Sequence, residues 1–202
     1  MKDKGLLKEA FNFHGHICWA SAMGVRAGLV ALRELGVKRT GSSGELHCIV
    51  EIGENHGAQC FIDGVQYATG CTLGKGNISK AGWGKLAITL IDKKSEKAIR
   101  VTYKPGRHKM VSESAFMKKR GLGIPPTEIP QEEAWEMVDI LWDAPENEVL
   151  GIGQVTRYDW GDDFGEILGM HACANCGEMV SKVYLRGVGE KLMCIPCSGY
   201  GR

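Results

Sequence analysis

The chain of 202 residues lacks a long uninterrupted apolar run. Its most apolar stretch, residues 18–35, contains Arg26 and Arg33, which excludes a membrane-spanning helix. The first thirteen residues carry charges every few positions and lack the apolar segment of a secretory signal. We therefore expect a cytoplasmic protein with no membrane association. In that compartment the eight cysteines are expected to be metal ligands or reactive thiols rather than disulfides.

A strong overall charge is missing as well, because the formal net charge is +1. The charges are unevenly distributed along the chain. Residues 75–120 hold 13 Lys and Arg against three acidic residues, whereas residues 121–170 hold 12 Asp and Glu against Arg157 alone. Two interpretations fit this pattern: two solvated faces that attract each other, which we favour, and a basic cleft for an anionic ligand.

The chain also lacks a nucleotide-binding P-loop. The sequence GCTLGKG (residues 70–76) resembles one, but it has one residue too few between its glycines. Gly76 stands where a Ser or Thr should bind Mg²⁺, so we exclude nucleotide hydrolysis by this loop. A backbone anion site around Gly74 to Asn77, assisted by Lys75, stays as an alternative.

Hydrophobic periodicity predicts helices and strands in mixed order. The expected helices span residues 2–13, 18–35, 59–69, 108–120 and 131–142, and the expected strands span residues 45–52, 85–92, 97–104 and 149–158. On the longest helix, Ala20, Gly24 and Gly28 form a ridge of small residues that lets another element approach closely. The predicted fold is α+β, with a mixed helix/sheet core domain (1–168) followed by a small C-terminal zinc ribbon (169–202).

Four cysteines at the C-terminal end form two C-x₂-C pairs, Cys173 with Cys176 and Cys194 with Cys197, separated by 17 residues. Each pair can sit on a tight turn with both sulfurs facing one point, which suits the tetrahedral preference of zinc. Since about 30 residues cannot build a sizeable core, we expect a structural zinc ion to stabilise this unit. The ribbon is almost neutral, so a nucleic-acid partner is not expected.

Near the N-terminus, the stretch FNFHGHIC (residues 11–18) places His14, His16 and Cys18 two residues apart, just before the longest predicted helix. In an extended segment all three side chains would point the same way. Cys18 would then lie in the first helical turn, where backbone N–H groups and the helix dipole favour a thiolate. Cys60 has a similar setting at the start of the next predicted helix.

We therefore take His14, His16, Cys18 and Cys60 as candidate catalytic residues that meet in one pocket of the core domain. Within this set, His16, Cys18 and Cys60 are the expected ligands of a second metal ion, zinc or another transition metal, with an open position for a ligand. Further candidates for the same pocket are His56, Asp63 and Cys71. The alternative is that these residues are packed core thiols and hydrogen-bonded histidines, and the sequence leaves the two interpretations level.

Taken together, these motifs resemble the FmdE family of formylmethanofuran dehydrogenase proteins. The resemblance rests on FHGHIC (13–18), GVR (24–26), CFIDGVQYATGCTLGKGN (60–77), GWGK (82–85) and the four-cysteine ribbon (173–197). It implies an α+β core with an appended zinc ribbon, in an intertwined homodimer whose His/Cys motif lines the functional pocket.

The resemblance also implies which residues form the site. It transfers His14, His16, Cys18 and Cys60, followed by Asp63, Gln66 and Lys75 as cofactor-binding residues. One departure is Trp19-Ala20, where the family usually has Pro-Gly. We expect the bulky Trp19 to narrow the pocket or to change its ligand.

Three functions fit these observations. The first is an accessory metal-binding protein of one-carbon, methanogenesis-related or molybdenum/tungsten-enzyme metabolism, with a dehydrogenase complex as partner. The second is a stand-alone metal-dependent enzyme, in which a histidine is a ligand or general base and a cysteine is a ligand or nucleophile. The third is a zinc-ribbon regulator that binds nucleic acid, which the nearly neutral ribbon disfavours. The chain is too small to enclose a pterin cofactor and lacks a ferredoxin pattern, so the resemblance alone does not make it an enzyme.

Overall fold

The structure is a computed structural model that describes residues 4–41, 44–54, 56–160 and 169–200. The chain divides into two compact units, residues 1–159 and residues 160–202. The predicted domain boundary between residues 168 and 169 lies at the end of a segment, 161–168, that is outside the described residues. Among the described residues, none of the helices combines the length and the apolar character that a membrane crossing requires.

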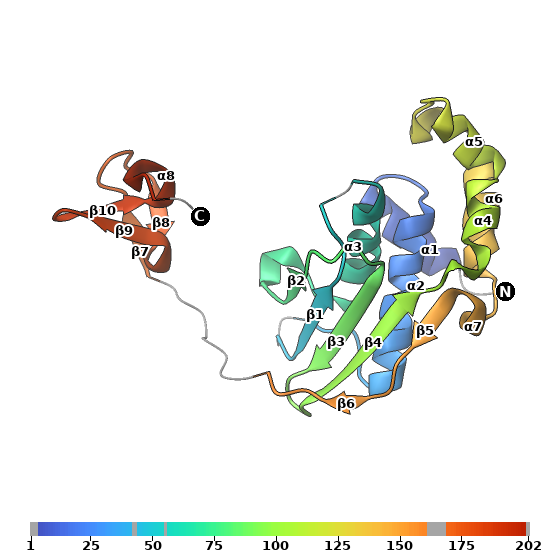
Figure 1. Cartoon of the computed structure of the whole chain (residues 1–202), viewed down its shortest axis with the longest axis horizontal. Coiled ribbons are helices and arrows are strands. Elements are labelled where there is room, and N and C mark those ends of the chain that lie inside the picture. Colours follow the sequence, from blue (N-terminus) through green and yellow to red (C-terminus); the bar gives the residue numbers. More distant parts are fainter. Residues whose placement is uncertain (1–3, 42–43, 55, 161–168, 201–202) are drawn as a thin grey trace. The chain divides into compact units, whose positions relative to one another are not determined.

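A mixed sheet forms one layer of the larger unit (Figure 1). In spatial order its strands are β2 (Ile78–Lys80), β1 (Leu46–Val50), β3 (Ala87–Asp92), β4 (Lys97–Tyr103) and β5 (Leu150–Ile152), and β6 (Thr156–Arg157) also pairs with β4. The β1–β2 pair is parallel and the other pairs are antiparallel. In the predicted β3–β4 hairpin Asp92 faces Lys97 across the turn. The strand predicted for residues 149–158 is split into β5 and β6, and the three-residue strand β2 carries no alternation from which it could be predicted.

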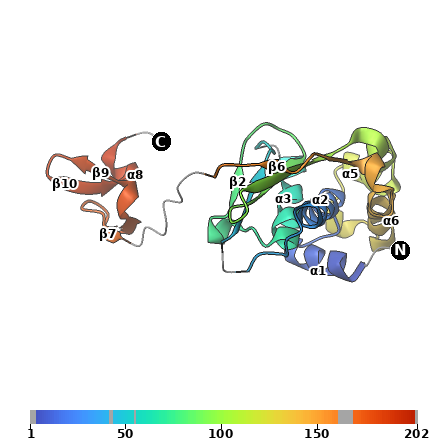
Figure 2. The same cartoon turned by 90° about the horizontal axis from the view of Figure 1, so that it is seen from below.

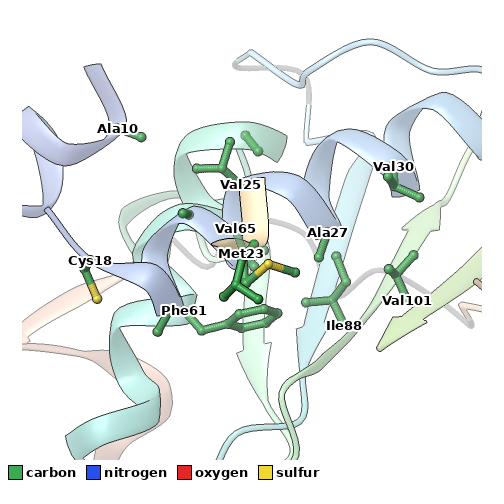
Figure 3. Close-up of a cluster of buried hydrophobic side chains, with 14 of the residues drawn as sticks. Ala10, Cys18, Met23, Val25, Ala27, Val30, Phe61, Val65, Ile88 and Val101 are labelled. Carbon is green, nitrogen blue, oxygen red and sulfur yellow. The ribbon is translucent and has the colours of Figure 1, made fainter. Parts of the chain in front are cut away.

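Helices α1 (Lys4–His14), α2 (Trp19–Leu35) and α3 (His56–Thr69) cover the sheet in two layers. Helix α2 packs against β3 and β4 and alongside α3, and α1 lies on the side of these two helices that faces away from the sheet (Figure 2). Figure 3 shows Met23 of α2 and Phe61 of α3 meeting above Ile88 of the sheet, in a cluster of fully buried apolar side chains. The larger unit therefore buries its core between the sheet and α2, with α3 at the side of α2.

Close contact between α2 and α3 depends on glycine. A Cβ atom added to Gly24 would lie 2.0 Å from the backbone oxygen of Phe61, and one added to Gly64 would lie 1.9 Å from that of Ser21. Each distance is far shorter than an ordinary carbon–oxygen contact of about 3.3 Å, so neither position accepts a larger residue without moving a helix. The predicted ridge of small residues on α2 is therefore the surface on which α3 packs.

The remaining helices of the larger unit are α4 (His108–Ser112), α5 (Ala115–Gly121), α6 (Gln131–Trp142) and α7 (Glu146–Val149), with 3₁₀ turns at η1 (Leu73–Lys75), η2 (Pro105–Arg107) and η3 (Pro126–Glu128). The single helix predicted for residues 108–120 is in fact α4 and α5. It is interrupted because the Ser114 hydroxyl accepts a hydrogen bond from the Met117 backbone N–H and caps α5. Helix α6 has the predicted bounds.

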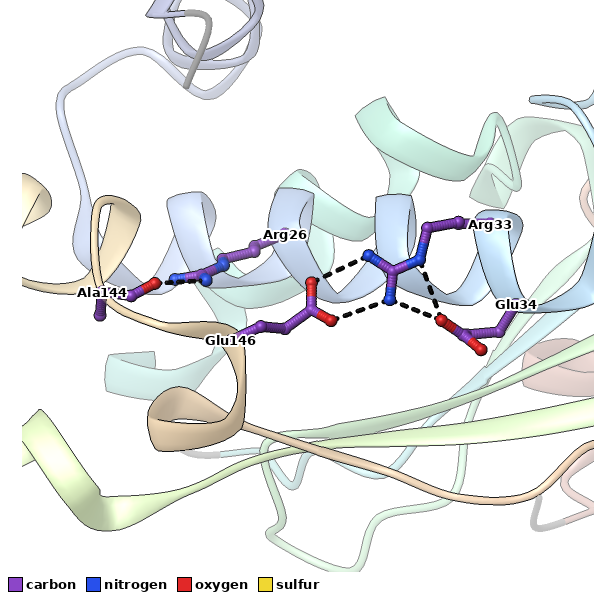
Figure 4. Close-up of polar contacts among 5 residues, drawn as sticks. All are labelled: Arg26, Arg33, Glu34, Ala144 and Glu146. Atoms are coloured by element: carbon purple, nitrogen blue, oxygen red, sulfur yellow. Dashed lines mark hydrogen bonds and ion pairs between the residues drawn. The ribbon is translucent and has the colours of Figure 1, made fainter. Parts of the chain in front are cut away.

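Two arginines of α2 hold the chain segment that follows α6 (Figure 4). The buried Arg26 guanidinium donates to the backbone oxygens of Leu141 and Ala144, at the end of α6. Arg33 pairs with Glu146 on α7 at 2.8 Å. The residue that interrupts the most apolar stretch of the sequence thus binds carbonyl groups that the end of α6 leaves without helical partners.

The smaller unit contains two short hairpins. They are β7 (Met170–Ala172) with β8 (Met179–Ser181) and β9 (Leu185–Val188) with β10 (Lys191–Cys194), followed by α8 (Ile195–Ser198). Residues 182–184, predicted as part of a strand, form a 3₁₀ turn, η4 (Lys182–Tyr184). The mixed helix/sheet class and the appended four-cysteine unit are confirmed.

Candidate metal centre

Four side chains that the sequence pattern singled out converge in the larger unit. One ligand atom from each of His14, His16, Cys18 and Cys60 lies within 4.8 Å of the others. His14 is the last residue of α1, Cys18 is the residue before α2, and Cys60 lies in the second turn of α3. These four residues are called the core cluster below.

The backbone that gathers the core cluster differs from the extended segment that was expected. His14 is helical, and Gly15 adopts a φ of 96°, in the region that favours glycine. The Gly15 N–H donates to the Phe11 oxygen at 2.7 Å, which closes the end of α1. Only Cys18 has an extended backbone, with a φ of −143°. The turn at Gly15, and not an alternation of side chains, brings both imidazoles to the same point.

Cys60 reaches this point because α3 packs so closely on α2. Cys60 lies one helical turn before Gly64, and Cys18 lies just before Ser21, whose backbone oxygen faces Gly64. The tight contact between the helices therefore fixes the separation of the two sulfurs. Figure 3 shows Cys18 at the start of α2, apart from the apolar cluster around Phe61.

Asp63 supports the core cluster from outside. Its Oδ2 atom lies 2.8 Å from Nδ1 of His14, whose side chain is only 6% exposed. Gln66 donates to the other Asp63 oxygen at 3.3 Å and accepts from the Leu73 N–H. Nε2 of His14 is buried and makes no hydrogen bond with the described residues. A histidine that is oriented by a carboxylate and has a free second nitrogen is the usual arrangement of a metal ligand.

The electrostatics of the core cluster couple a thiolate to a cation. The Cys18 thiol, followed by His14, lowers the pKa of Cys60 from 9.0 to about 4. Hydrogen bonding to Asp63 and then to Cys60 raises the pKa of His14 from 6.5 to about 9. Donation to Cys60, followed by burial, raises the pKa of Cys18. Burial and the neighbouring His14 lower the pKa of His16. In the metal-free protein Cys60 is therefore a thiolate beside a protonated His14.

The residues of the core cluster fit a transition-metal ion. Two thiols and two imidazoles form a donor set that zinc accepts in tetrahedral geometry. The orphaned Nε2 of His14 would gain a partner, and Asp63 would hold the imidazole ring by its other nitrogen. Metal binding would have to displace protons from His14 and Cys18, so the affinity is expected to rise with pH.

Other predicted site residues lie elsewhere. Lys75 donates to the Gly41 oxygen at 2.7 Å and is not part of the core cluster. Cys71 is fully buried and interacts with Cys48 of β1. The His56 side chain is outside the described residues. Around the P-loop-like turn, the backbone N–H groups bond within the protein and are not free for an anion; these are the N–H groups of Thr72, Leu73, Lys75 and Gly76.

A pocket of about 560 Å³ borders His16, between α1, the following linker, η3 and α6. Its lining includes Lys8, Phe11 and Trp135, which sequence reasoning missed. No local pattern identifies them, because the pocket joins residues more than a hundred positions apart. Trp19 does not narrow this pocket as expected. Its ring packs 5.4 Å from that of His108 and 5.9 Å from that of Tyr103, and it is not among the lining residues.

The smaller unit carries the second cluster, here called the ribbon cluster. Its members are Cys173, Cys176, Cys194 and Cys197, whose sulfurs lie within 4.8 Å of one another. The backbone N–H of Cys194 donates to the Cys173 sulfur at 3.3 Å, and backbone N–H groups of Cys176 and Cys194 lower the pKa of Cys173 to about 6. Both clusters are compatible with binding a metal ion such as zinc.

Comparison with known proteins identifies the family. Residues 13–150 match the model of the family described as "FmdE, Molybdenum formylmethanofuran dehydrogenase operon". The chain belongs to the FmdE family. The matched region contains all four residues of the core cluster, and the ribbon cluster lies outside it.

Two known proteins are similar to this FmdE-family chain over nearly its whole length. One is the crystal structure of a tungsten formylmethanofuran dehydrogenase FmdE-like protein from Syntrophus aciditrophicus. It matches with a TM-score of 0.57 and 20% identity, covering 97% of this chain and 91% of the other. The second is a protein from Archaeoglobus fulgidus named a probable S-adenosyl-L-methionine-binding protein. It is 29% identical over 205 residues, which cover 96% of this chain and 52% of the relative. This chain therefore spans about half the length of that relative.

Proposed function

We propose that this FmdE-family protein binds a transition-metal ion, zinc in the first instance, in its core cluster and a structural zinc ion in its ribbon cluster. We propose further that it serves as an accessory protein of one-carbon or molybdenum/tungsten-enzyme metabolism. The observation that carries the first proposal is the convergence of two thiols and two imidazoles from three separate elements within 4.8 Å. The accessory role is supported by the operon that the family description names.

Each residue of the core cluster has a distinct part in this proposal. Cys18 and Cys60 would bind the ion as thiolates, and His14 would bind it through Nε2. Asp63 would accept the Nδ1 proton of His14 and keep the ring oriented. His16, which borders the pocket, would be the fourth ligand or would yield its position to an incoming molecule. A bound zinc ion supplies Lewis-acid chemistry at such a position.

Metal analysis of the purified full-length chain tests the two metal sites. The wild type should hold two metal equivalents. Removing the core thiols with Cys18→Ser and Cys60→Ser should leave one, and Cys173→Ser with Cys176→Ser should leave the other. A wild-type chain that holds one equivalent and loses it only with the ribbon substitutions would contradict the core site.

A stand-alone metal-dependent enzyme is the second candidate, and the pocket beside His16 is the observation that favours it. An accessory protein needs no cavity for a small molecule at its metal site, whereas an enzyme does. S-adenosyl-L-methionine is one ligand to test, because the Archaeoglobus relative is named for it. The ligand could be bound there by the half of that relative that this chain does not match, so calorimetric titration with and without metal is needed.

The accessory proposal predicts a partner. We propose an intertwined homodimer that associates with a dehydrogenase complex. Affinity purification of the tagged protein should recover components of a molybdenum or tungsten dehydrogenase, and Cys60→Ser should reduce this recovery if the core metal matters. Light scattering of the purified protein should give twice the chain mass. Recovery of the chain alone, as a monomer, would contradict both statements.

A further inference from the structure

The pocket that borders His16 has features of a ligand site that neither the family description nor the relatives assign. We propose that it binds an organic carboxylate with an apolar body, oriented so that the molecule extends from Lys8 at the rim to His16 at the core cluster. The orientation toward the metal rests on the proposed function, whereas the binding itself does not. The pocket volume of about 560 Å³ lies within the range of small-molecule sites.

The apolar wall of the pocket comes from two helices. Phe11 of α1 and Trp135 of α6 lie with ring centroids 5.4 Å apart at an angle of 59°. Phe11 is 5% exposed, so it is fixed by the core, and Trp135 packs against the same core. Ala134 and Ile129, both buried, complete this side of the lining. A ligand that buries an apolar surface here would be stabilised by its removal from water.

The charge of the pocket favours an anion. Lys8 lines the pocket and has no ion pair or hydrogen bond with any other described residue. No carboxylate is among the described lining residues. Acidic residues that lie near the pocket in sequence already have cationic partners: Lys4 pairs with Asp139 at 2.7 Å, and Lys119 pairs with Glu133. The Lys8 ammonium is therefore an uncompensated positive charge that an anionic ligand would neutralise.

Polar side chains complete the site. Asn12, Thr127 and Gln131 line the pocket, and their side chains make no hydrogen bond in the part of the chain that the structure describes. They leave donors and acceptors available around the carboxylate and along the ligand. At the inner end lies His16, the member of the core cluster that borders the cavity. The pocket thus joins a cationic rim, an apolar wall and a candidate metal ligand.

Benzoate is the test probe, and benzylamine, a cation at neutral pH, is its matched control of similar shape. Saturation-transfer NMR with the full-length protein should show saturable benzoate binding, with a Kd on the order of 1–10 mM for so small a probe. Benzylamine should bind at least about fivefold more weakly. Lys8→Glu should weaken benzoate by about fivefold or more and remove the preference over benzylamine. Lys97→Glu, an exposed lysine of β4 that does not line the pocket, should change neither affinity.

Cobalt(II) exchanged into the protein reports whether the ligand reaches the core cluster. Benzoate should change the visible spectrum, and the difference spectrum cancels the contribution of the ribbon cluster. Trp135→Leu should weaken benzoate binding, and circular dichroism will show whether this variant is folded. Equal affinities for benzoate and benzylamine, or a Lys8→Glu variant that binds benzoate normally, would overturn the carboxylate site. Benzoate binding without a spectral change would overturn the orientation toward the cluster.

The two proposals can fail separately. If cobalt occupies both clusters but no benzoate binding is detected up to roughly 50 mM, the pocket inference is wrong and the metal proposal stands. If the core cluster takes up no cobalt, the metal proposal is wrong. Benzoate binding measured by NMR on the metal-free protein still decides whether Lys8 and Trp135 form a carboxylate site.

Discussion

Replacing Gly64 by alanine should loosen the contact that sets the core cluster. The added Cβ would lie 1.9 Å from the Ser21 oxygen and 2.7 Å from the Val25 nitrogen, both of which are backbone atoms. Reaching an ordinary carbon–oxygen contact of about 3.3 Å requires a displacement of roughly 1.4 Å between α2 and α3. Overpacking of this kind typically costs about 1–3 kcal/mol, and two backbone contacts favour the upper end. For a unit of this size we expect the Tm to fall by about 6–12 °C.

The same displacement should reach the metal site, because Cys18 and Cys60 each lie about one turn from the crowded contact. A site that tolerates errors of only about 0.5 Å should lose at least roughly tenfold in metal affinity. The assays are thermal unfolding by circular dichroism and cobalt titration of the full-length chain. Gly74→Ala is the matched control, since a Cβ there meets nothing within 4 Å. Gly28→Ala, whose Cβ would lie 2.8 Å from the Ala68 side chain, should have an intermediate effect. Equal Tm and equal cobalt affinity for all three variants would refute the reasoning.

Three further predictions concern the clusters. Asp63→Asn should weaken the core metal by about 10–100-fold in a chelator competition, because His14 loses its orienting carboxylate; unchanged affinity would exclude Asp63 from this role. Cys176→Ser should remove one metal equivalent and abolish amide protection in the ribbon, while the Tm of the larger unit stays the same. In metal-free protein, the lowered pKa of Cys60 keeps it ionised at every pH above its own value of about 4, so its alkylation by iodoacetamide should be nearly constant between pH 6 and 8 and should fall only as the pH approaches that value. A tenfold rise per pH unit over pH 6–8, as for an ordinary thiol, would contradict this ionisation.

Features that depend on nearby residues could be predicted from the sequence. The apolar stripe of α2 and its terminal Gly36 are local, and the left-handed Gly36, with a φ of 69°, ends the helix as expected. The spacing of the ribbon cysteines is also local, since each pair lies on its own turn. The break at Ser114 is local too, but a capping serine inside an otherwise helical pattern competes with helix propensity and was missed.

Features that depend on tertiary contacts could not be predicted. Arg26 reads as an interruption of an apolar run, and its role in binding the end of α6 depends on a partner 115 residues away. The pocket joins Lys8 to Trp135 across an even longer separation. The core cluster is intermediate: its residue types were evident from FNFHGHIC and Cys60, but the turn at Gly15 and the support from Asp63 became visible only in the fold.

Anomalous diffraction from crystals of the full-length chain, recorded on both sides of the zinc edge, tests the central claim most directly. The account predicts two zinc peaks per chain, one in the ribbon and one bonded to the sulfurs of Cys18 and Cys60 at about 2.3 Å, with a histidine nitrogen at about 2.0–2.1 Å. A single peak in the ribbon, from protein purified without chelators and supplied with zinc, would contradict it.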